Sequence, residues 1–376
     1  MKSNSPVNNL NWCTNCLTMS TRPRITFDAR GWCNACVWSE KKRSLNWDAR
    51  QVELERLLDK HRKNDGSFDC MVPCSGGKDG SYVAYNLKYK YGMNPLCVTI
   101  TPALTLPLGD QNLRAFVASG YNHISVNPDH EAMRILNKIG FIKMGFPYYG
   151  WLIAIHTAVI RMATAFNINL IFYGEDGEVE YGGSAETSKN PIYDVYYQKK
   201  VYLEGGYEKV IAASGLTASQ LNFFNFPRDS ELNKHEIQLT HWSYFENWDP
   251  YRNYLIAKEH CGLKEAEDSN TGTFTNFSQN DQALYALHTY LMYLKFGFGR
   301  ANQDACIEVR RGAMDREQAV NLVRLYDGHY PEEFMPLYLD YYQMTQAEFD
   351  KVLDHYANQE LFEKIDGRWM PNFIVK

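Results

Sequence analysis

The sequence predicts an α/β fold built on a doubly wound parallel sheet. Short apolar runs have the pattern of buried strands at residues 68–74, 96–101, 123–126 and 169–173. Helical patterns follow them at residues 81–91, 109–119, 131–138 and 151–166. Strands that alternate with helices of this length form parallel sheets, which bind ligands at the carboxyl ends of the strands. A glycine-rich turn after the first of these strands marks an expected ligand site at that edge.

A cysteine-rich segment, residues 1–45, precedes this unit. It contains two CxxC pairs separated by sixteen residues: Cys13, Cys16, Cys33 and Cys36. This spacing is typical of a four-thiolate zinc ribbon. The intervening Pro23, Gly31 and β-prone residues 24–27 favour two short hairpins that hold the pairs. Because four protein ligands leave zinc no open position, we expect a structural Zn²⁺ site.

Residues 46–240 are the expected main domain. It opens with an amphipathic helix at residues 46–64, whose apolar positions recur among charged ones: Val52, Leu54, Leu57 and Leu58. This pattern predicts a helix that joins the zinc ribbon to the sheet.

The first predicted strand of the sheet ends in a glycine-rich turn. The turn and the start of the next helix contain Ser75, Gly76, Gly77, Lys78, Asp79, Gly80 and Ser81. Glycines let backbone N–H groups approach an anion, and the N-terminus of the following helix adds a favourable dipole. The run has neither the P-loop spacing nor that of the dinucleotide-binding fingerprint. It is nevertheless built to hold phosphate.

This turn resembles the PP-loop of the ATP pyrophosphatases, which implies an adenine nucleotide alpha-hydrolase-like fold. The resemblance implies that the loop binds the pyrophosphate half of ATP while a substrate oxygen attacks the α-phosphorus. It gives Lys78 and Asp79 the catalytic positions, with Asp79 also holding Mg²⁺. The sixth residue of the motif is usually Ser, whereas here Gly80 is followed by Ser81. Whether the Ser81 hydroxyl replaces that contact stays open.

Two further strand ends are candidate ATP-site positions. Thr99 and Thr101 end the second strand, where backbone groups of PP-loop enzymes meet adenine. Gly174 follows the fourth strand and precedes Glu175 and Asp176, which are candidate Mg²⁺ ligands beside a polyphosphate. An exposed acidic turn is the alternative interpretation of these two carboxylates.

The segment 179–237 breaks the α/β rhythm and is rich in tyrosine. Its first part contains Tyr181 and Gly182, which we assign to substrate binding. Tyrosine combines an apolar face with a hydrogen-bonding tip, so this segment suits stacking on a sugar or a nucleobase. An oligomer interface would use the same residues, and the sequence does not separate the two.

Residues 241–376 are expected to form a helical region that binds substrate or a partner. Arg300 and Arg310 lie in a glycine-punctuated stretch and are candidate clamps for a diphosphate or carboxylate. For Arg310 and its neighbour Arg311, a salt-bridged helix face is an equally good interpretation.

Composition excludes several classes of protein. The chain has 376 residues, 45% of them hydrophobic and 22% charged, as in soluble globular proteins. The net charge of −5 provides no general attraction to nucleic acid or anionic lipid. The longest apolar run, residues 151–166, is interrupted by His156 and Arg161, so we expect no membrane insertion. Residues 1–12 lack the apolar core of a signal peptide, and a cytoplasmic location is expected.

The order of these motifs along nearly the whole chain resembles that of the N-acetyl sugar amidotransferases. These are bacterial enzymes of lipopolysaccharide O-antigen and related surface-sugar biosynthesis. The resemblance implies a UDP-linked acetamido sugar substrate, typically a diacetamido uronic acid, whose acetamido group becomes an acetamidino group. It further implies ammonia supplied by a glutaminase subunit and an ammonia-channelling barrel subunit, similar to the imidazole glycerol phosphate synthase pair.

A tRNA thiolase of the PP-loop superfamily is the main alternative function. Such enzymes also carry N-terminal CxxC pairs, but they typically need further cysteines after the loop. The later cysteines here are single, and the net charge is negative. A catalytically inactive ATP-binding scaffold is a third alternative, which the presence of Lys78 and Asp79 disfavours.

Overall fold

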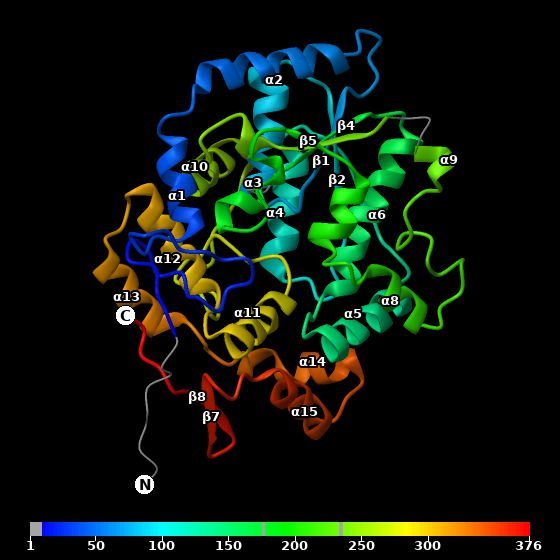
Figure 1. The fold of residues 1–376 in the computed structure, drawn as a ribbon. Coiled ribbons are helices and arrows are strands. Elements are labelled where there is room, and N and C mark those ends of the chain that lie inside the picture. The colour runs from blue at the N-terminus through cyan, green and yellow to red at the C-terminus, as the bar shows by residue number, and fades with distance from the viewer. Residues whose placement is uncertain (1–9, 175–176, 233–235) are drawn as a thin grey trace.

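The computed structural model describes residues 10–174, 177–232 and 236–376 (Figure 1). Its centre is a six-stranded sheet with the order β3-β2-β1-β4-β6-β5. The strands are β1 (Cys70–Pro73), β2 (Pro95–Ile100), β3 (Asn122–Val126), β4 (Leu170–Tyr173), β5 (Ile192–Tyr193) and β6 (Gln238–His241). All neighbours pair in parallel except β5, which is antiparallel to β6 at the edge. The predicted α/β class with a doubly wound parallel sheet is confirmed.

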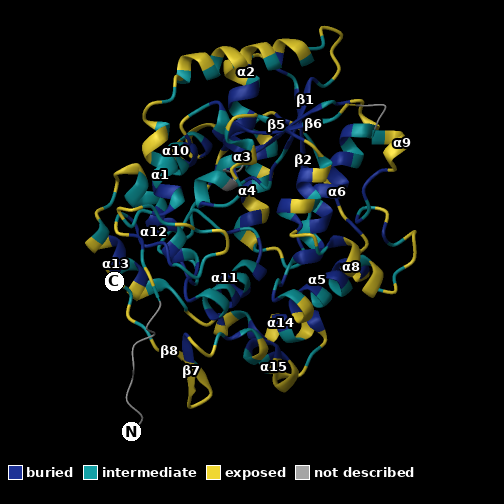
Figure 2. Ribbon diagram, viewed as in Figure 1, coloured by how far each residue is buried: buried dark blue, intermediate teal, exposed yellow. Residues whose placement is uncertain are grey.

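Helices cover both faces of the sheet (Figures 1 and 2). Met71 of β1 faces a core that contains α5 (His130–Met144) and α6 (Tyr149–Ala165). Cys70 and Val72 face the opposite core, to which α2 (Trp47–His61), α3 (Lys78–Tyr85) and α4 (Pro107–Ala118) contribute. Strands buried on both faces have continuous apolar sequences. This is why β1, β2 and β4 could be recognised from the sequence.

The sequence analysis missed strands β5 and β6. β6 contains Thr240 and His241, which are buried polar residues, so it lacks the apolar run of a central parallel strand. The strand also crosses the expected domain boundary between residues 240 and 241. Beyond it, α10 (Pro250–Cys261) packs directly on α3 and therefore belongs to the sheet domain.

The tyrosine-rich insertion packs largely into the protein core beside β5 and β6. Tyr193, Tyr197 and Tyr207 are buried, and the Tyr202 hydroxyl lies 2.6 Å from Nε2 of His241. Tyr196 is the contrasting case, with 72% of its surface exposed. Most of these rings therefore support the edge of the sheet, a role not considered in the sequence analysis.

The C-terminal region is helical, as predicted, and ends in a hairpin that was not predicted. Its helices are α11 (Leu284–Phe296), α12 (Arg300–Arg311), α13 (Arg316–Tyr326), α14 (Met335–Tyr342) and α15 (Gln346–Tyr356). Strands β7 (Phe362–Ile365) and β8 (Arg368–Pro371) follow. Asp366 and Gly367 form the turn between them with φ angles of 49° and 81°. An Asp-Gly pair between two strands is a strong hairpin signal, so this element was recognisable.

Shorter elements connect these parts. They are α1 (Asn34–Lys42), the π-helical η1 (Asn86–Lys90), η2 (Glu178–Tyr181), η3 (Glu186–Ser188), α7 (Val195–Tyr197), η4 (Gln198–Tyr202), α8 (Tyr207–Ala213), α9 (Asp229–Leu232), η5 (Trp242–Tyr244) and η6 (Glu332–Phe334). Within the described ranges, no helix combines the length and apolarity needed to cross a membrane.

Asp327 provides a pH-dependent contribution to stability. Its Oδ2 accepts a 2.7 Å hydrogen bond from the backbone N–H of Gly299, at the start of α12. Burial raises the pKa of Asp327 from 3.8 to about 7, although hydrogen bonds from the backbone oppose the shift. The folded state therefore keeps a proton between about pH 4 and pH 7 that the unfolded chain has lost. Stability falls as the pH rises through this window.

We expect the substitution Asp327→Asn to abolish this fall in stability with rising pH. The amide oxygen can still accept the Gly299 N–H bond, but the side chain has no proton to release. Urea unfolding should show the variant gaining stability relative to the wild type between pH 4 and pH 8, and the gain should level off above about pH 7. Parallel stability curves for the two proteins would contradict this role of Asp327.

Candidate active site

The turn after β1 is held in a shape that exposes its backbone to a ligand. Gly76 has a φ of +80°, and a Cβ there would lie 2.6 Å from the backbone N and Cα of Leu113 in α4. Gly77 is the N-cap of α3, whose first residue is Lys78. The turn and the first turn of α3 thus form a cradle for an anion, which fits the triphosphate of ATP.

Gly80 is required by the packing of two strand ends. A Cβ on Gly80 would lie 2.6 Å from Cβ of Cys74. On the other side, a Cβ on Gly174 would lie 2.7 Å from the backbone N and Cα of Gly80. The turns after β1 and β4 therefore meet without side chains, where the strand order reverses and open α/β sheets bind ligands. This accounts for glycine at the motif's sixth position.

Ser81 does not replace the missing hydroxyl. It is fully buried, it is absent from the cavity wall, and its Oγ has no hydrogen-bond partner among the described residues. Ser75, at the other end of the loop, does line the cavity. In this structure Ser75, and not Ser81, therefore presents its side chain to the cavity.

Lys78 and Asp79 form an ion pair at the N-terminus of α3. The Asn253 Nδ2 of α10 donates a 3.0 Å hydrogen bond to Oδ1 of Asp79. The carboxylate is thus fixed between a cation and an amide, beside the phosphate cradle. Its oxygens are the hard ligands that Mg²⁺ prefers, so this position fits the ion.

A cavity of about 740 Å³ opens from this loop. The expected site residues that line it are Ser75, Gly77, Lys78, Asp79, Gly80, Thr99, Gly174, Tyr181 and Arg300. Gly76, Thr101, Gly182 and Arg310 lie outside its wall. Glu175 and Asp176 lie outside the described residues. We call the glycine-rich turn after β1, residues 75–80, the phosphate loop. The cavity brings together this loop, the carboxyl ends of the strands and the C-terminal region.

The C-terminal region supplies a wall that sequence reasoning missed, and Asp281 is its main acidic group. The side chain of Asp281 is hydrogen-bonded to Ser75 of the phosphate loop and to Tyr285. Burial raises the pKa of Asp281 to about 6. Its backbone oxygen accepts a 3.0 Å bond from the N–H of Leu106, which anchors the wall to the turn after β2.

His288 and Arg300 complete this wall. Burial lowers the pKa of His288 to about 3, so its ring is neutral at physiological pH. Nε of Arg300 donates a 2.8 Å bond to Oδ1 of Asp304, whose Oδ2 accepts one from Thr273. Burial opposes the charge of Arg300, but Asp304 outweighs it and the pKa is raised. Arg300 is a fixed cation facing the cavity, as expected for a residue that binds an anionic substrate.

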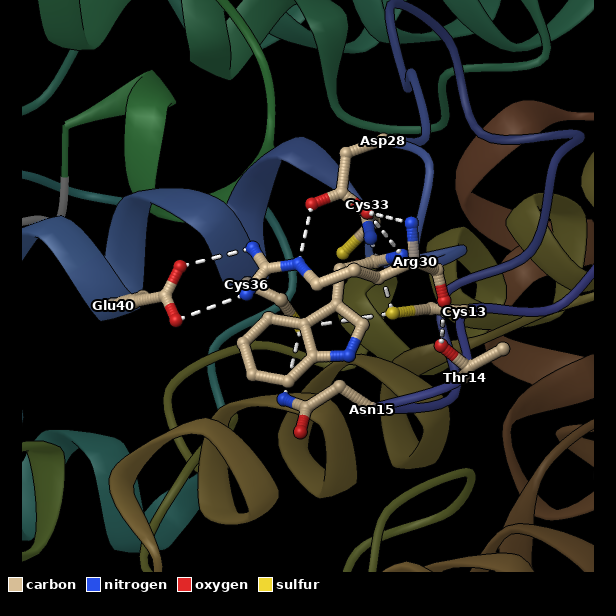
Figure 3. A network of polar contacts seen from close by, with 9 residues as sticks. Cys13, Thr14, Asn15, Asp28, Arg30, Cys33, Cys36 and Glu40 are labelled. Carbon is tan, nitrogen blue, oxygen red and sulfur yellow. Dashed lines mark hydrogen bonds and ion pairs between the residues drawn. The ribbon is translucent and has the colours of Figure 1, made fainter.

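The four N-terminal cysteines meet in one buried cluster, of which Figure 3 shows Cys13, Cys33 and Cys36. Their Sγ atoms all lie within 4.8 Å of one another. The backbone N–H of Cys33 donates to Sγ of Cys13 at 3.1 Å, and that of Thr18 donates to Sγ of Cys16 at 3.4 Å. Such donors stabilise thiolates, so the cluster fits a structural Zn²⁺.

The second cysteine pair spans the end of a hairpin and the start of a helix: Cys33 forms an antiparallel bridge with Phe27, whereas Cys36 lies in α1. Isolated bridges join Trp12 to Met19 and Phe27 to Cys33, and α1 begins directly after Cys33. Arg30 links the loop before Cys33 to α1, because it pairs with Asp28 at 2.8 Å and with Glu40 at 2.9 Å (Figure 3).

Arg310 belongs to this cluster and not to the substrate cavity. Its Nη1 lies 3.9 Å from Sγ of Cys16, and its Nη2 donates to the backbone oxygen of Glu180 at 3.3 Å. Arg310 was expected to contact substrate, but it does not line the cavity. A buried guanidinium instead balances the negative charge of the thiolates. Gly182 lies nearby, and its carbonyl accepts a 2.8 Å bond from Asn34.

We expect about one zinc per chain in purified protein. Replacing Cys16 by Ser should release the metal and lower the unfolding temperature, because a tetrahedral site with three thiolates binds far more weakly. Metal analysis and thermal unfolding measure both effects. Cys261→Ser is the matched control, since Cys261 is also buried but lies outside the cluster, and this variant should retain its zinc. A metal-free wild type of full stability would exclude the assignment.

Comparison with known proteins finds a family model that matches the C-terminal region. Residues 271–373 match the family model of the "LPS biosynthesis protein WbpG-like, C-terminal domain". An uncharacterized protein of Methanocaldococcus jannaschii is 32% identical over 89 residues, which are 23% of this chain and 32% of that protein. The chain thus spans about a third of this curated relative's length.

Two solved structures show weaker likeness. A U34-tRNA thiolase from Methanococcus maripaludis with its [4Fe-4S] cluster has a TM-score of 0.32 at 14% identity, over 71% of this chain and 79% of that one. A "predicted subunit of tRNA methyltransferase" from Methanocaldococcus jannaschii has a TM-score of 0.28 at 14% identity, over 64% and 90%. Scores this low carry no argument about function. The family match, in contrast, agrees with the resemblance to enzymes of lipopolysaccharide biosynthesis.

Proposed function

We propose, taking the lipopolysaccharide-biosynthesis match of residues 271–373 as the premise, that the protein is an ATP-dependent amidotransferase. It adenylates the acetamido oxygen of a UDP-linked acetamido sugar, such as a diacetamido uronic acid, and replaces that oxygen with nitrogen from ammonia. The products are an acetamidino sugar for O-antigen synthesis, AMP and pyrophosphate.

One observation carries this proposal. The family-matched region lines the same cavity as the phosphate loop, through Asp281, His288 and Arg300. Asp281 is even hydrogen-bonded to Ser75 of the loop. A region typical of surface-sugar biosynthesis therefore faces the nucleotide-binding end of the cavity. A sugar bound against this wall would present its acetamido group to the α-phosphorus.

The chemistry requires two steps at one carbon. The acetamido oxygen forms a bond to the α-phosphorus of ATP, and the bond from that phosphorus to pyrophosphate breaks. Ammonia then adds to the activated carbon, the bond from carbon to the AMP oxygen breaks, and one proton passes from the added nitrogen to the AMP phosphate. An amide is a poor electrophile, so the first step makes the second one feasible.

Lys78 and the loop N–H groups would hold the β- and γ-phosphates and stabilise the leaving pyrophosphate. Asp79 would hold Mg²⁺, which neutralises charge on the phosphates when bound. Arg300 would pair with an anionic group of the sugar nucleotide. The Asp304 contact keeps that guanidinium in place.

The arrangement of cysteines supports this function over a tRNA thiolase. Within the described part of the chain, the N-terminal Cys₄ cluster is the only group of three or more residues with metal-ligand geometry. Cys74 lines the cavity, but it is buried at 8% exposure. A thiolase would need a sulfur-carrying cysteine or cluster at the nucleotide site.

Product analysis tests the proposal directly. The protein is incubated with ATP, ammonium and candidate UDP-acetamido sugars, and the products are identified by mass spectrometry. We expect AMP, pyrophosphate and a sugar about one dalton lighter, because NH replaces O. ADP and phosphate as products would exclude attack at the α-phosphorus. Sulfur incorporation into tRNA would establish the alternative function.

The nitrogen source is proposed to be a separate glutaminase that acts with an ammonia-channelling barrel subunit. Glutamine alone should then support no turnover, and ammonium salts should support more as the pH rises and uncharged NH₃ becomes available. Efficient use of glutamine by this chain alone would contradict the proposal.

A further inference from the structure

A second pocket lies behind the C-terminal wall of the active-site cavity. It has a volume of about 390 Å³ and is formed by the turn after β2, the loop of residues 266–283, the start of α11 and η6. Gln279 lines both this pocket and the active-site cavity. Gln279 is therefore the lining residue that the two spaces share. We call this space the Gln282 pocket, after the residue discussed next.

Gln282 presents an unpaired amide to this pocket. The residue is only 1% exposed, and neither Nε2 nor Oε1 has a hydrogen-bond partner among the described residues. The Oε1 of Gln279 is buried and likewise lacks a partner within the described chain, while its Nε2 lies 3.5 Å from the hydroxyl of Thr289. A buried amide without partners destabilises the folded state, because its hydration is lost and not replaced. A small ligand that both donates and accepts hydrogen bonds would offset this cost.

The mouth of the pocket is acidic. Asp268 and Glu333 lie on its rim, and both are exposed to solvent. The hydroxyl of Thr271 donates a 2.6 Å bond to Oε1 of Glu333, which joins the two sides of the mouth. No lysine or arginine is part of the lining formed by described residues. Such a rim raises the local concentration of small cations.

The active-site cavity itself has to accept two large reactants. Its volume of about 740 Å³ lies within the range of pockets that bind a single drug-sized molecule. With ATP and a sugar nucleotide bound, little of this volume would be left for ammonia to pass through. A third reactant therefore needs another way to the activated carbon.

We propose that the Gln282 pocket is the inlet for ammonia, a proposal that rests on the proposed amidotransferase function. Ammonium is collected at the acidic rim and gives up a proton to solvent there. Neutral ammonia then exchanges hydrogen bonds with the amides of Gln282 and Gln279 and enters the cavity past Gln279. A donor protein would dock over this mouth, on η6 and the loop of residues 266–271.

Gln282→Leu tests the inlet because it removes the amide and keeps the volume. The variant should fold at least as stably as the wild type, since a buried unpaired amide is lost. With ATP and sugar saturating, kcat/KM for ammonium chloride should fall at least tenfold. The sugar-dependent exchange of pyrophosphate into ATP needs no ammonia, so it should stay within twofold of the wild type.

Two further variants keep the test decisive. Ala286→Met narrows the same pocket from α11 and should give the same selective loss. Thr240→Val is the matched control, because Thr240 is fully buried with an unpaired Oγ1 in the described structure and lines neither space. It should leave kcat/KM for ammonium unchanged.

The outcomes separate the two proposals. Ammonium kinetics within twofold of the wild type for both Gln282→Leu and Ala286→Met would overturn the inlet and leave the amidotransferase function standing. An equal loss of pyrophosphate exchange and ammonium use would also overturn it. Absence of sugar-dependent exchange in the wild type would instead reject the proposed function, and the inlet with it.

Discussion

Asp79→Ala is expected to abolish sugar-dependent release of AMP and pyrophosphate while the fold stays intact. Removing a single group that stabilises charge in a transition state costs about 10²–10³ in turnover, and Asp79 would additionally lose the metal. The fold should persist because the ion pair with Lys78 lies at the cavity, and the only bond lost from a buried residue of the described chain is the single hydrogen bond from Asn253. Pyrophosphate release and circular dichroism measure the two properties.

Asp110→Ala is the matched control for this experiment. Asp110 also lies in the first turn of a helix, α4, but it is exposed and does not line the cavity. Its loss should leave turnover within about twofold. Retention of more than a tenth of wild-type turnover by Asp79→Ala would remove this carboxylate from the proposed mechanism.

Gly76→Ala is expected to cause the largest loss of stability among simple substitutions in the loop. The new Cβ would lie 2.6 Å from the backbone of Leu113, and φ is +80°. Backbone of α4 cannot move aside as a side chain can. We expect a loss of more than about 4 kcal/mol, or no folded protein, together with loss of ATP binding.

Substitutions at two other glycines distinguish the two causes of this stability loss, the contact with Leu113 and the positive φ. Gly66 has a φ of +85°, and a Cβ there would have no atom within 4 Å, so Gly66→Ala isolates the conformational strain of about 1–2 kcal/mol. Gly77 has a negative φ, and the nearest neighbour of a Cβ there would be Oγ of Ser75 at 3.4 Å. Gly77→Ala should therefore unfold close to the wild type. Equal unfolding free energies for Gly76→Ala and Gly66→Ala would show that the contact with Leu113 is unimportant.

The elements that could be predicted are those with a local signal. β1, β2 and β4 are continuous apolar runs, and the CxxC spacing identified the metal cluster without any structure. Strand β6 was not predicted, because its buried residues Thr240 and His241 are polar and are typical of loops. Burial of these polar groups depends on neighbours that lie far away in the chain.

The active-site wall could not be predicted for the same reason. Asp281 and His288 sit in and after an asparagine-rich loop without periodicity, and only the fold brings this loop onto the phosphate loop. The position of Arg310 was unforeseen for a different reason. Its sequence neighbourhood resembled an anion clamp, whereas the anions that it meets are thiolates from the start of the chain, 294 positions away in the case of Cys16.

The contacts of the N-terminal cysteine-rich segment with α12 and α13 have a consequence for synthesis on the ribosome. The hydroxyl of Thr18 bonds to Cys306 across 288 positions, and Arg316 reaches the carbonyl of Cys13 across 303. At about 5–20 residues per second, roughly 15–60 s pass between translation of the two partners. During this interval the helices that bury these cysteines in the folded protein have not yet been synthesised. Early capture of the metal would shield these thiols from oxidation until the helices emerge, so zinc supply during translation should influence how much of the protein matures correctly.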